Sequence, residues 1–406
     1  MNSQPYGSPD RHWPPRLNAW WFYALQGHRQ RELRRQQMTL LEFEGLHHLA
    51  QAGRKGLGVL ITPNHSFHWD SYCLLEAAQR LRLPFYTMTA WQVFAQSSWF
   101  ESMSLQRCGC FSVDREGADL RSLRTAIDIL VERAQPLVIF PEGDIFHTND
   151  WVTPLRDGAA SIALLAAKKA KRPVVIIPTA IKRWYLTDPA PSLLQTMSKL
   201  EKRLFGKPNT GSNLLQRLLL LAQGLLGLKE LQYLGETRSG TLASRMEFLA
   251  RQLTCQLEVK YGLKVSQISL PDRVVFMRRQ IVKQKTNTSS VCPSTDAALD
   301  DLFLVSQLYS YRGDYLCQHP SWERMAETLD KLEEDFLGAT YPTVRGPKRV
   351  IVRFGEPIRL PSVRTDCMPT ALQLITQIQT QIQQELNQLN SLCPSGGFYP
   401  ASSLDN

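Results

Sequence analysis

The sequence GVLITPNHSFHWD, residues 58–70, describes a buried strand that turns into a helix. The apolar run Val59 to Ile61 is short and contains β-branched residues, which favours a strand covered on both faces. Pro63 and Asn64 interrupt the run, and a helical pattern follows over residues 66–81. The segment therefore predicts a strand-to-helix corner that carries several polar side chains.

The same alternation of strand and helix continues through residues 39–182. Apolar runs predict further strands at 84–88, 111–113, 137–140 and 174–178, and helical patterns occur at 117–134 and 158–169. This order is typical of a largely parallel central sheet with helices on both faces, so the expected fold class is α/β. Such sheets place their functional site at the carboxyl ends of the strands.

The remainder of the chain predicts helices and one isolated strand. Helices are expected at 192–204, 213–233, 241–261 and 271–283, an exposed loop at 284–296, and a last helix at 370–392. Residues 349–354 predict a strand, which we expect to join the sheet of the first half because a lone strand leaves its backbone groups unpaired. The predicted segments are a tail and a basic, aromatic helix (1–38), the α/β core (39–185), a helical insertion (186–347), and the returning strand with the C-terminal helix (348–406).

The composition limits the partners that this chain can have. A formal net charge of +10 over 406 residues favours contact with an anionic membrane surface, an acidic carrier protein or a phosphorylated substrate. Nucleic acid is disfavoured, because the charge is spread along the chain without a binding motif. The eight cysteines form no C-x-x-C pair, which gives little support to a zinc site or a disulfide framework.

Three segments bear on contact with a membrane. Residues 1–16 lack an apolar run and predict a loose tail with no signal peptide. The stretch 218–228 is shorter than the roughly 20 apolar residues of a membrane span, so we expect no transmembrane helix. The helix expected from residue 16 has an aromatic half, 19–25, and a basic half, 29–35; it could lie in a membrane interface or pack its aromatic rings on the core. The same two alternatives hold for the leucine-rich helix over 214–231.

His65 and Asp70 are the first candidates for chemistry. They are five positions apart, about 140° on a regular helix, so they meet only if His65 precedes the helix and Asp70 lies in its first turns. Asp70 could then accept a hydrogen bond from one ring nitrogen, and the other nitrogen could take a proton from a hydroxyl. Asn64 is suited to support this turn. The alternative is a helix-capping histidine beside a surface acid.

A metal site is the competing interpretation of this corner. His65, His68 and Asp70 could act together as ligands in a metal-dependent hydrolase. No further His, Glu or Cys cluster with ligand spacing follows downstream, so we expect no metal.

Two further positions follow predicted strands. Arg115 comes after the strand at 111–113, where an arginine can bind a phosphate with two hydrogen bonds or form a surface ion pair with Asp114. Glu142 and Gly143 come after the strand at 137–140, where the glycine permits a tight turn close to a substrate and the glutamate could bind hydroxyl groups. Pro-Glu-Gly is also a frequent turn composition.

Taken together, these segments resemble the glycerolipid acyltransferase family typified by bacterial 1-acylglycerol-3-phosphate acyltransferase. Its motif N-H-x-x-x-x-D is matched by Asn64, His65 and Asp70. Its motif G-x-x-F-I-x-R is matched at Gly109 and Arg115, with Val113 in place of Ile and Ser112 where Phe is usual. The resemblance covers residues 40–185 and 349–360, including the apolar strand 174–178 and the segment 156–159.

The third motif of the family, F-P-E-G-T-R-S, is matched only through Gly143. Asp144, Ile145 and Phe146 follow it in place of Thr-Arg-Ser. Two cationic contacts on a phosphate thereby become one, and the aspartate adds a repulsive charge. A cation just after the fourth motif, Lys182 or Arg183, could supply the missing contact.

The resemblance implies an O-acyltransferase of phospholipid biosynthesis. His65 would be the general base and Asp70 its partner, while Arg115, Glu142 and Gly143 would hold the glycerol phosphate of the acceptor, with Asn64 also among the substrate-binding residues. The donor would be acyl-CoA or acyl-carrier protein, used as a substrate, with no cofactor. The acceptor would be a lysophospholipid such as 1-acylglycerol-3-phosphate.

The resemblance also implies a place of action, a peripheral or monotopic position on the cytoplasmic side of an anionic membrane. The altered third motif leaves one more alternative, a non-catalytic relative that binds lipid.

Overall fold

The computed structural model describes residues 9, 11–115, 119–169, 171–262, 269–287, 293–311, 313–361 and 368–392. These residues form two compact units. One unit combines the described residues up to Pro189 with those from Thr343 onward, and the other runs from Ala190 to Pro342. The segment predicted as an insertion, 186–347, includes this second unit and extends a few residues beyond it at each end.

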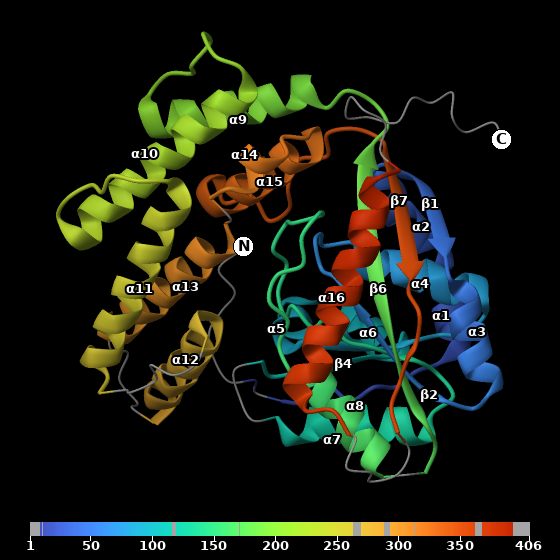
Figure 1. Ribbon diagram of the computed structural model, residues 1–406. Coiled ribbons are helices and arrows are strands. Elements are labelled where there is room, and N and C mark those ends of the chain that lie inside the picture. The colour runs from blue at the N-terminus through green and yellow to red at the C-terminus, as the bar shows by residue number, and fades with distance from the viewer. Residues whose placement is uncertain are drawn as a thin grey trace. The chain divides into compact units, whose positions relative to one another are not determined.

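The first unit is built on a mostly parallel sheet, which confirms the predicted α/β class (Figure 1). The strand order is β1-β7-β6-β2-β5-β3-β4, and β8 also pairs with β6. The strands are β1 (Met38–Glu44), β2 (Gly58–Pro63), β3 (Tyr86–Ala90), β4 (Cys110–Val113), β5 (Leu137–Val138), β6 (Val174–Tyr185), β7 (Lys348–Phe354) and β8 (Ile358–Arg359).

Strand β7 is the returning strand predicted from residues 349–354. It lies between β1 and β6, so that Val352 pairs with Phe43 in a parallel ladder and with Ile181 in an antiparallel one. Its backbone groups are therefore satisfied on both sides. The C-terminal part of the chain thus completes the sheet of the first half, as expected.

Helices cover both faces of this sheet. Alternate residues of β2 point to opposite faces, so Leu60 belongs to one buried core and Val59 and Ile61 to the other. The first core also contains residues of α7 (Leu120–Glu132), α8 (Gly158–Lys168) and α16 (Ala371–Asn390), and Figure 1 shows α16 in red against β6. The second core contains residues of α1 (Ala19–Ala24), α2 (Gln26–Arg35), α3 (Leu46–Arg54) and α4 (Asp70–Leu81).

The N-terminal segment differs from the prediction in two ways. The single helix expected from residue 16 is divided at Leu25 into α1 and α2. Its aromatic side chains also differ in their exposure to solvent. Phe22 is buried beneath the guanidinium of Arg29, whereas Trp20 is 73% exposed. Packing on the core and exposure to the surroundings therefore both occur in this segment.

Trp13, in the tail predicted to be loose, packs against other residues of the first unit. Residues 1–8 and 10 lie outside the described residues, but Trp13 is buried and stacks on Phe94 at 5.4 Å. Its backbone N–H donates to the hydroxyl of Ser112 on β4, and the N–H of Ser112 donates to the Trp13 carbonyl. Ser112 thus holds the N-terminal segment at the sheet edge.

The second unit is helical and has its own core. It contains α9 (Ala190–Phe205), α10 (Leu214–Leu234), α11 (Leu242–Lys260), α12 (Leu270–Asn287), α13 (Pro293–Ser310), α14 (Tyr315–Gln318) and α15 (Trp322–Leu337). Its buried core is formed by side chains of α10 to α13 and includes Leu226, Leu253, Met277 and Leu302. The loop predicted at 284–296 is shorter, since α12 extends to Asn287 and α13 starts at Pro293; residues 288–292 are outside the described residues.

Two short helices, α5 (Trp91–Gln96) and α6 (Trp99–Arg107), connect β3 to β4 in the first unit. The side chain of Trp99 is 76% exposed at the start of α6. Within the described residues, none of the helices combines the length and the apolar composition that crossing a bilayer requires.

Candidate functional site

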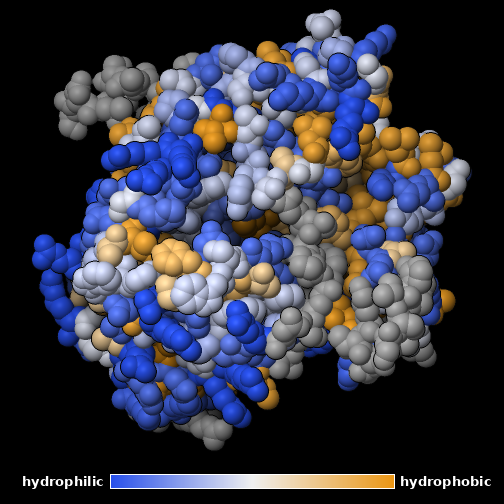
Figure 2. All heavy atoms as spheres, turned by 180° about the vertical axis from the view of Figure 1, so that it is seen from behind, coloured by the Kyte–Doolittle hydropathy of each residue, from blue (hydrophilic) through white to orange (hydrophobic). Residues whose placement is uncertain are grey.

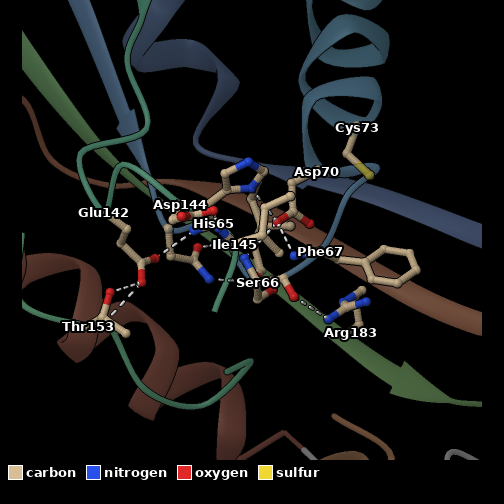
Figure 3. A network of polar contacts seen from close by, with 12 residues as sticks. His65, Ser66, Phe67, Asp70, Cys73, Glu142, Asp144, Ile145, Thr153 and Arg183 are labelled. Carbon is tan, nitrogen blue, oxygen red and sulfur yellow. Dashed lines mark hydrogen bonds and ion pairs between the residues drawn. The ribbon is translucent and has the colours of Figure 1, made fainter. Parts of the chain in front are cut away.

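His65 and Asp70 meet at the corner between β2 and α4. Strand β2 ends at Pro63, His65 lies in the connecting turn, and Asp70 is the first residue of α4. The ring nitrogen Nδ1 of His65 is 3.2 Å from Oδ2 of Asp70, and the two side chains point toward one another (Figure 3). This is the arrangement that their five-residue spacing requires.

The Asp70 carboxylate is held from several directions. It is fully buried, and its Oδ2 also accepts hydrogen bonds from the backbone N–H groups of Ser66, at 2.8 Å, and Phe67, at 2.7 Å. Two backbone N–H groups and the N-terminus of α4 therefore face this carboxylate. Because a carboxylate only accepts, Nδ1 of His65 is the donor in this contact, and in a neutral imidazole Nε2 is then the nitrogen with the lone pair.

The His65 ring is also fixed from the side of β5. It stacks on Phe140, with ring centroids 4.1 Å apart. The backbone N–H of His65 donates to Oε1 of Glu142 at 2.6 Å. The His65 side chain is 17% exposed, so the ring is held in place but keeps some access from outside.

Glu142 joins two loops beneath the histidine. Its side chain is buried, and its Oε2 accepts hydrogen bonds from the backbone N–H of Thr153, at 3.2 Å, and from the Thr153 hydroxyl (Figure 3). Together with the bond from His65, these contacts fasten the β2 corner to the loop that follows β5. Thr153 did not stand out in the sequence, and the binding of substrate hydroxyls by Glu142 stays a prediction.

We expect the stability of the protein to depend on the protonation of Glu142. Burial raises the pKa of Glu142 from 4.5 to about 8, although the hydrogen bonds from Thr153 and His65 oppose this shift. Between these pH values the folded state holds a proton that the unfolded chain releases. The free energy of unfolding should therefore fall as the pH rises from about 4.5 to about 8, by up to roughly 1.4 kcal/mol per pH unit.

Urea unfolding of the wild type and of Glu142→Gln across this pH range measures the effect. The Gln variant should lose the slope that Glu142 contributes. The control Glu356→Gln changes a side chain that is 82% exposed and should keep it. Parallel curves for the wild type and Glu142→Gln would contradict the assignment.

Two asparagine side chains bind the free edge of β6 beyond the end of β2. The amide of Asn64 donates to the carbonyl of Ile181 at 3.1 Å and accepts from its N–H at 2.7 Å. Asn149 makes the same pair of bonds with Arg183, at 2.7 and 2.9 Å. These amides take the place of a neighbouring strand, so Asn64 supports the turn as expected. Its role in binding substrate stays a prediction.

Two arginines lie at the corner formed by Gly143 and Asp144. Arg115 donates from Nη1 to the carbonyl oxygen of Gly143, and the same nitrogen is 3.9 Å from Oδ2 of Asp144. Gly143 has a φ of +76°, and a Cβ at this position would lie 2.6 Å from Nε of Arg156. Burial opposes the charge of Asp144, but Arg115 and Arg156 hold its pKa below the ordinary value.

Arg156 is the second cation of this corner, and the sequence had suggested Lys182 or Arg183 in that role. Lys182 is buried and forms an ion pair with Asp150. Arg183 is buried over the ring of Phe67, 4.1 Å from its centroid, and donates to the Ser66 carbonyl at 3.2 Å. These two cations thus hold loops next to the histidine. In the sequence, segment 156–159 is marked only by its resemblance to the family.

His65, His68 and Asp70 do not converge on one point. In the part of the chain that the structure describes, the ligand atoms of His65, His68 and Asp70 do not all lie within 4.8 Å of one another. The ring of His68 is instead 5.6 Å from the ring of His147. Nδ1 of His65 faces a carboxylate that two backbone N–H groups already hold, which is typical of an oriented base.

Comparison with known proteins adds one finding. Residues 41–182 match the family model described as Acyltransferase. This range includes the corner with His65 and Asp70 as well as Arg115, Glu142 and Gly143. No curated protein matches the chain.

Proposed function

Because residues 41–182 form a domain of the acyltransferase family, we propose that this acyltransferase moves a fatty acyl group from a thioester to a hydroxyl group of a glycerolipid acceptor. The observation that carries the proposal is the 3.2 Å contact between Nδ1 of His65 and the buried carboxylate of Asp70. This contact leaves Nε2 of the imidazole available as a base.

The proposed reaction uses His65 twice. Its Nε2 removes the proton of the acceptor hydroxyl while the hydroxyl oxygen forms a bond to the carbonyl carbon of the thioester. Asp70 stabilises the imidazolium that results. The tetrahedral intermediate then breaks its carbon–sulfur bond, and the leaving thiolate takes the proton from the imidazolium. The products are an ester and a free thiol, and the base is restored.

We propose a phosphorylated lysolipid such as 1-acylglycerol-3-phosphate as the acceptor. Arg115 and Arg156 beside Gly143 support this choice, because guanidinium groups suit phosphate oxygens. The donor would be acyl-CoA or acyl-carrier protein. Such acceptors reside in bilayers, so the proposed place of action is a membrane surface, with phospholipid biosynthesis as the process.

An assay with a labelled acyl thioester and a panel of lysolipids tests the proposal. We expect the label in a diacylglycerol phosphate, identified by mass. Release of free fatty acid as the sole product would instead favour a hydrolase, and the absence of any turnover on the panel would favour a non-catalytic lipid-binding relative.

Asp144 should reduce the preference for a phosphorylated acceptor. Replacing it with Asn removes a negative charge 3.9 Å from Arg115. Both side chains are partly exposed, so water screens this charge. We therefore expect kcat/KM for the phosphorylated acceptor to rise roughly three- to tenfold relative to that for a phosphate-free monoacylglycerol. The ratio of the two kcat/KM values measures the effect.

Two variants serve as comparisons for Asp144→Asn. Arg156→Gln should change the ratio in the opposite direction. Asp128→Asn, at an exposed carboxylate that pairs with Lys169, should leave it unchanged. A ratio that Asp144→Asn does not alter would argue against a phosphate at this corner.

A further inference from the structure

Helix α10 of the second unit carries a stripe of exposed apolar side chains. Leu220, Leu228 and Leu231 are each 50% to 55% exposed. Counted from Leu220, they are eight and eleven positions apart and therefore share one side of the helix. Figure 2 shows hydrophobic side chains over this part of the molecule, at the upper right, beside hydrophilic ones.

An aromatic ring from α9 completes the stripe. Gly224 lies between Leu220 and Leu228 on the same side of α10, and a Cβ there would be 3.0 Å from Cζ of Phe205. The Phe205 side chain is itself 50% exposed. The four apolar groups therefore form a row along about three turns of helix, or roughly 16 Å.

Another face of α10 is packed into the unit. Leu218 and Leu221 are buried, and so is Leu214 at the start of the helix. The buried leucines therefore belong to the core of the second unit, whereas Leu220, Leu228 and Leu231 are exposed on another face. The three exposed leucines can therefore be substituted without leaving a cavity in the buried core.

Most of the exposed charges of the α9–α10 hairpin are positive. Between residues 190 and 235, all of which the structure describes, the carboxylates are Glu201 and Glu230, and both are buried; Glu236, which follows directly, is exposed. Each forms two hydrogen bonds with an arginine, Glu201 with Arg217 and Glu230 with Arg245. The exposed charged side chains of this segment are the cations Lys199, Lys202, Arg203 and Lys207.

We propose that the α9–α10 hairpin is a docking surface for an anionic lipid bilayer. Leucine and phenylalanine next to lysine and arginine is the combination that binds a bilayer interface, with apolar groups among the acyl chains and cations at the headgroups. A second copy of the chain would bring cations against cations, which disfavours self-association through this face. The proposal rests on the second unit alone, so its failure leaves acyl transfer by the first unit untouched.

Vesicle flotation of the full chain tests the apolar part. With vesicles of equal parts phosphatidylglycerol and phosphatidylcholine, the combined changes Leu220→Ser, Leu228→Ser and Leu231→Ser should lower the partition coefficient at least tenfold. The control changes three exposed leucines of the first unit, Leu120→Ser, Leu165→Ser and Leu372→Ser, and should bind as the wild type does. Circular dichroism and thermal unfolding confirm that both proteins are folded.

A second variant tests the charges. The combined changes Lys199→Gln, Lys202→Gln, Arg203→Gln and Lys207→Gln should reduce binding at low salt at least tenfold. They should also remove most of the salt dependence seen in the wild type. Turnover of a water-soluble short-chain acceptor should stay the same in both variants, which separates docking from catalysis.

Four results would overturn the proposal. The wild type could fail to bind these vesicles, or the leucine variant could bind them as the wild type does. Binding could also be lost in Trp20→Ala with Trp99→Ala and kept in the leucine variant, which would place the surface on α1 and α6. If an acidic carrier protein competes for the four cations and vesicles do not, the hairpin is a protein-binding surface instead.

Discussion

Replacing His65 with Ala is expected to remove acyl transfer and to leave the fold intact. General base catalysis contributes about a hundredfold to ten-thousandfold in rate, so kcat/KM should fall by roughly a thousandfold or more. The backbone N–H of residue 65 can still donate to Glu142, and Asp70 keeps its two backbone donors. The melting temperature should therefore change by only a few degrees.

Transfer of label from an acyl thioester to the acceptor measures this loss. His47→Ala is the matched control, because His47 is an exposed histidine outside the corner, and it should retain full turnover. Near-normal turnover in folded His65→Ala would reject the assignment of the base.

Asp70 should act through His65 and also hold the corner itself, and two substitutions separate these roles. Asp70→Asn keeps the shape and an acceptor oxygen but removes the charge that stabilises the imidazolium. We expect kcat to fall about a hundredfold or more while KM changes little, because the substituted group does not touch the substrate.

Asp70→Ala should reduce stability as well as activity. It leaves the N–H groups of Ser66 and Phe67 buried without their acceptor, at a cost of about 1–3 kcal/mol for each group. Urea unfolding measures this difference between the Ala and Asn variants. Equal stability of the two would show that the turn does not depend on the carboxylate, and a purely structural role would leave kcat of folded Asp70→Asn unchanged.

The corner at residues 58–70 could be predicted because its determinants are local. The apolar run of β2, the proline that follows it and the spacing of His65 and Asp70 all lie within a few residues of one another. Only the helix start was wrong, since α4 begins at Asp70 and not at residue 66. The carboxylate binds the backbone of the preceding residues in a turn, which delays the helix.

Strands that depend on distant partners were not predictable in the same way. β1 was missed because Glu42 and Glu44 do not suggest a strand, and their ion-pair partners, Arg349 and Arg353, lie about 300 residues away in the chain. β6 was expected to end at Pro178 but continues to Tyr185, because β7 pairs with the additional residues. Local propensity carries no information on such contacts.

In the candidate site, too, the residues within local motifs could be predicted and those brought in by distant segments could not. Motif spacing indicated the histidine, its carboxylate and Arg115, which follow strand ends. Thr153 and Arg156 lie in the long connection between β5 and α8 and reach the site only through the folded path of that loop. Glu142 was found by its motif, but its contacts with His65 and Thr153 became apparent only in the structure.

In the proposed site the buried Asp70 carboxylate holds the imidazole of His65 with its base nitrogen free. This arrangement can be examined by the nitrogen NMR spectrum of histidine-labelled protein at neutral pH, with His65→Ala used to assign the signal. We predict a proton on Nδ1 and none on Nε2. A proton on Nε2 with Nδ1 unprotonated would contradict the account.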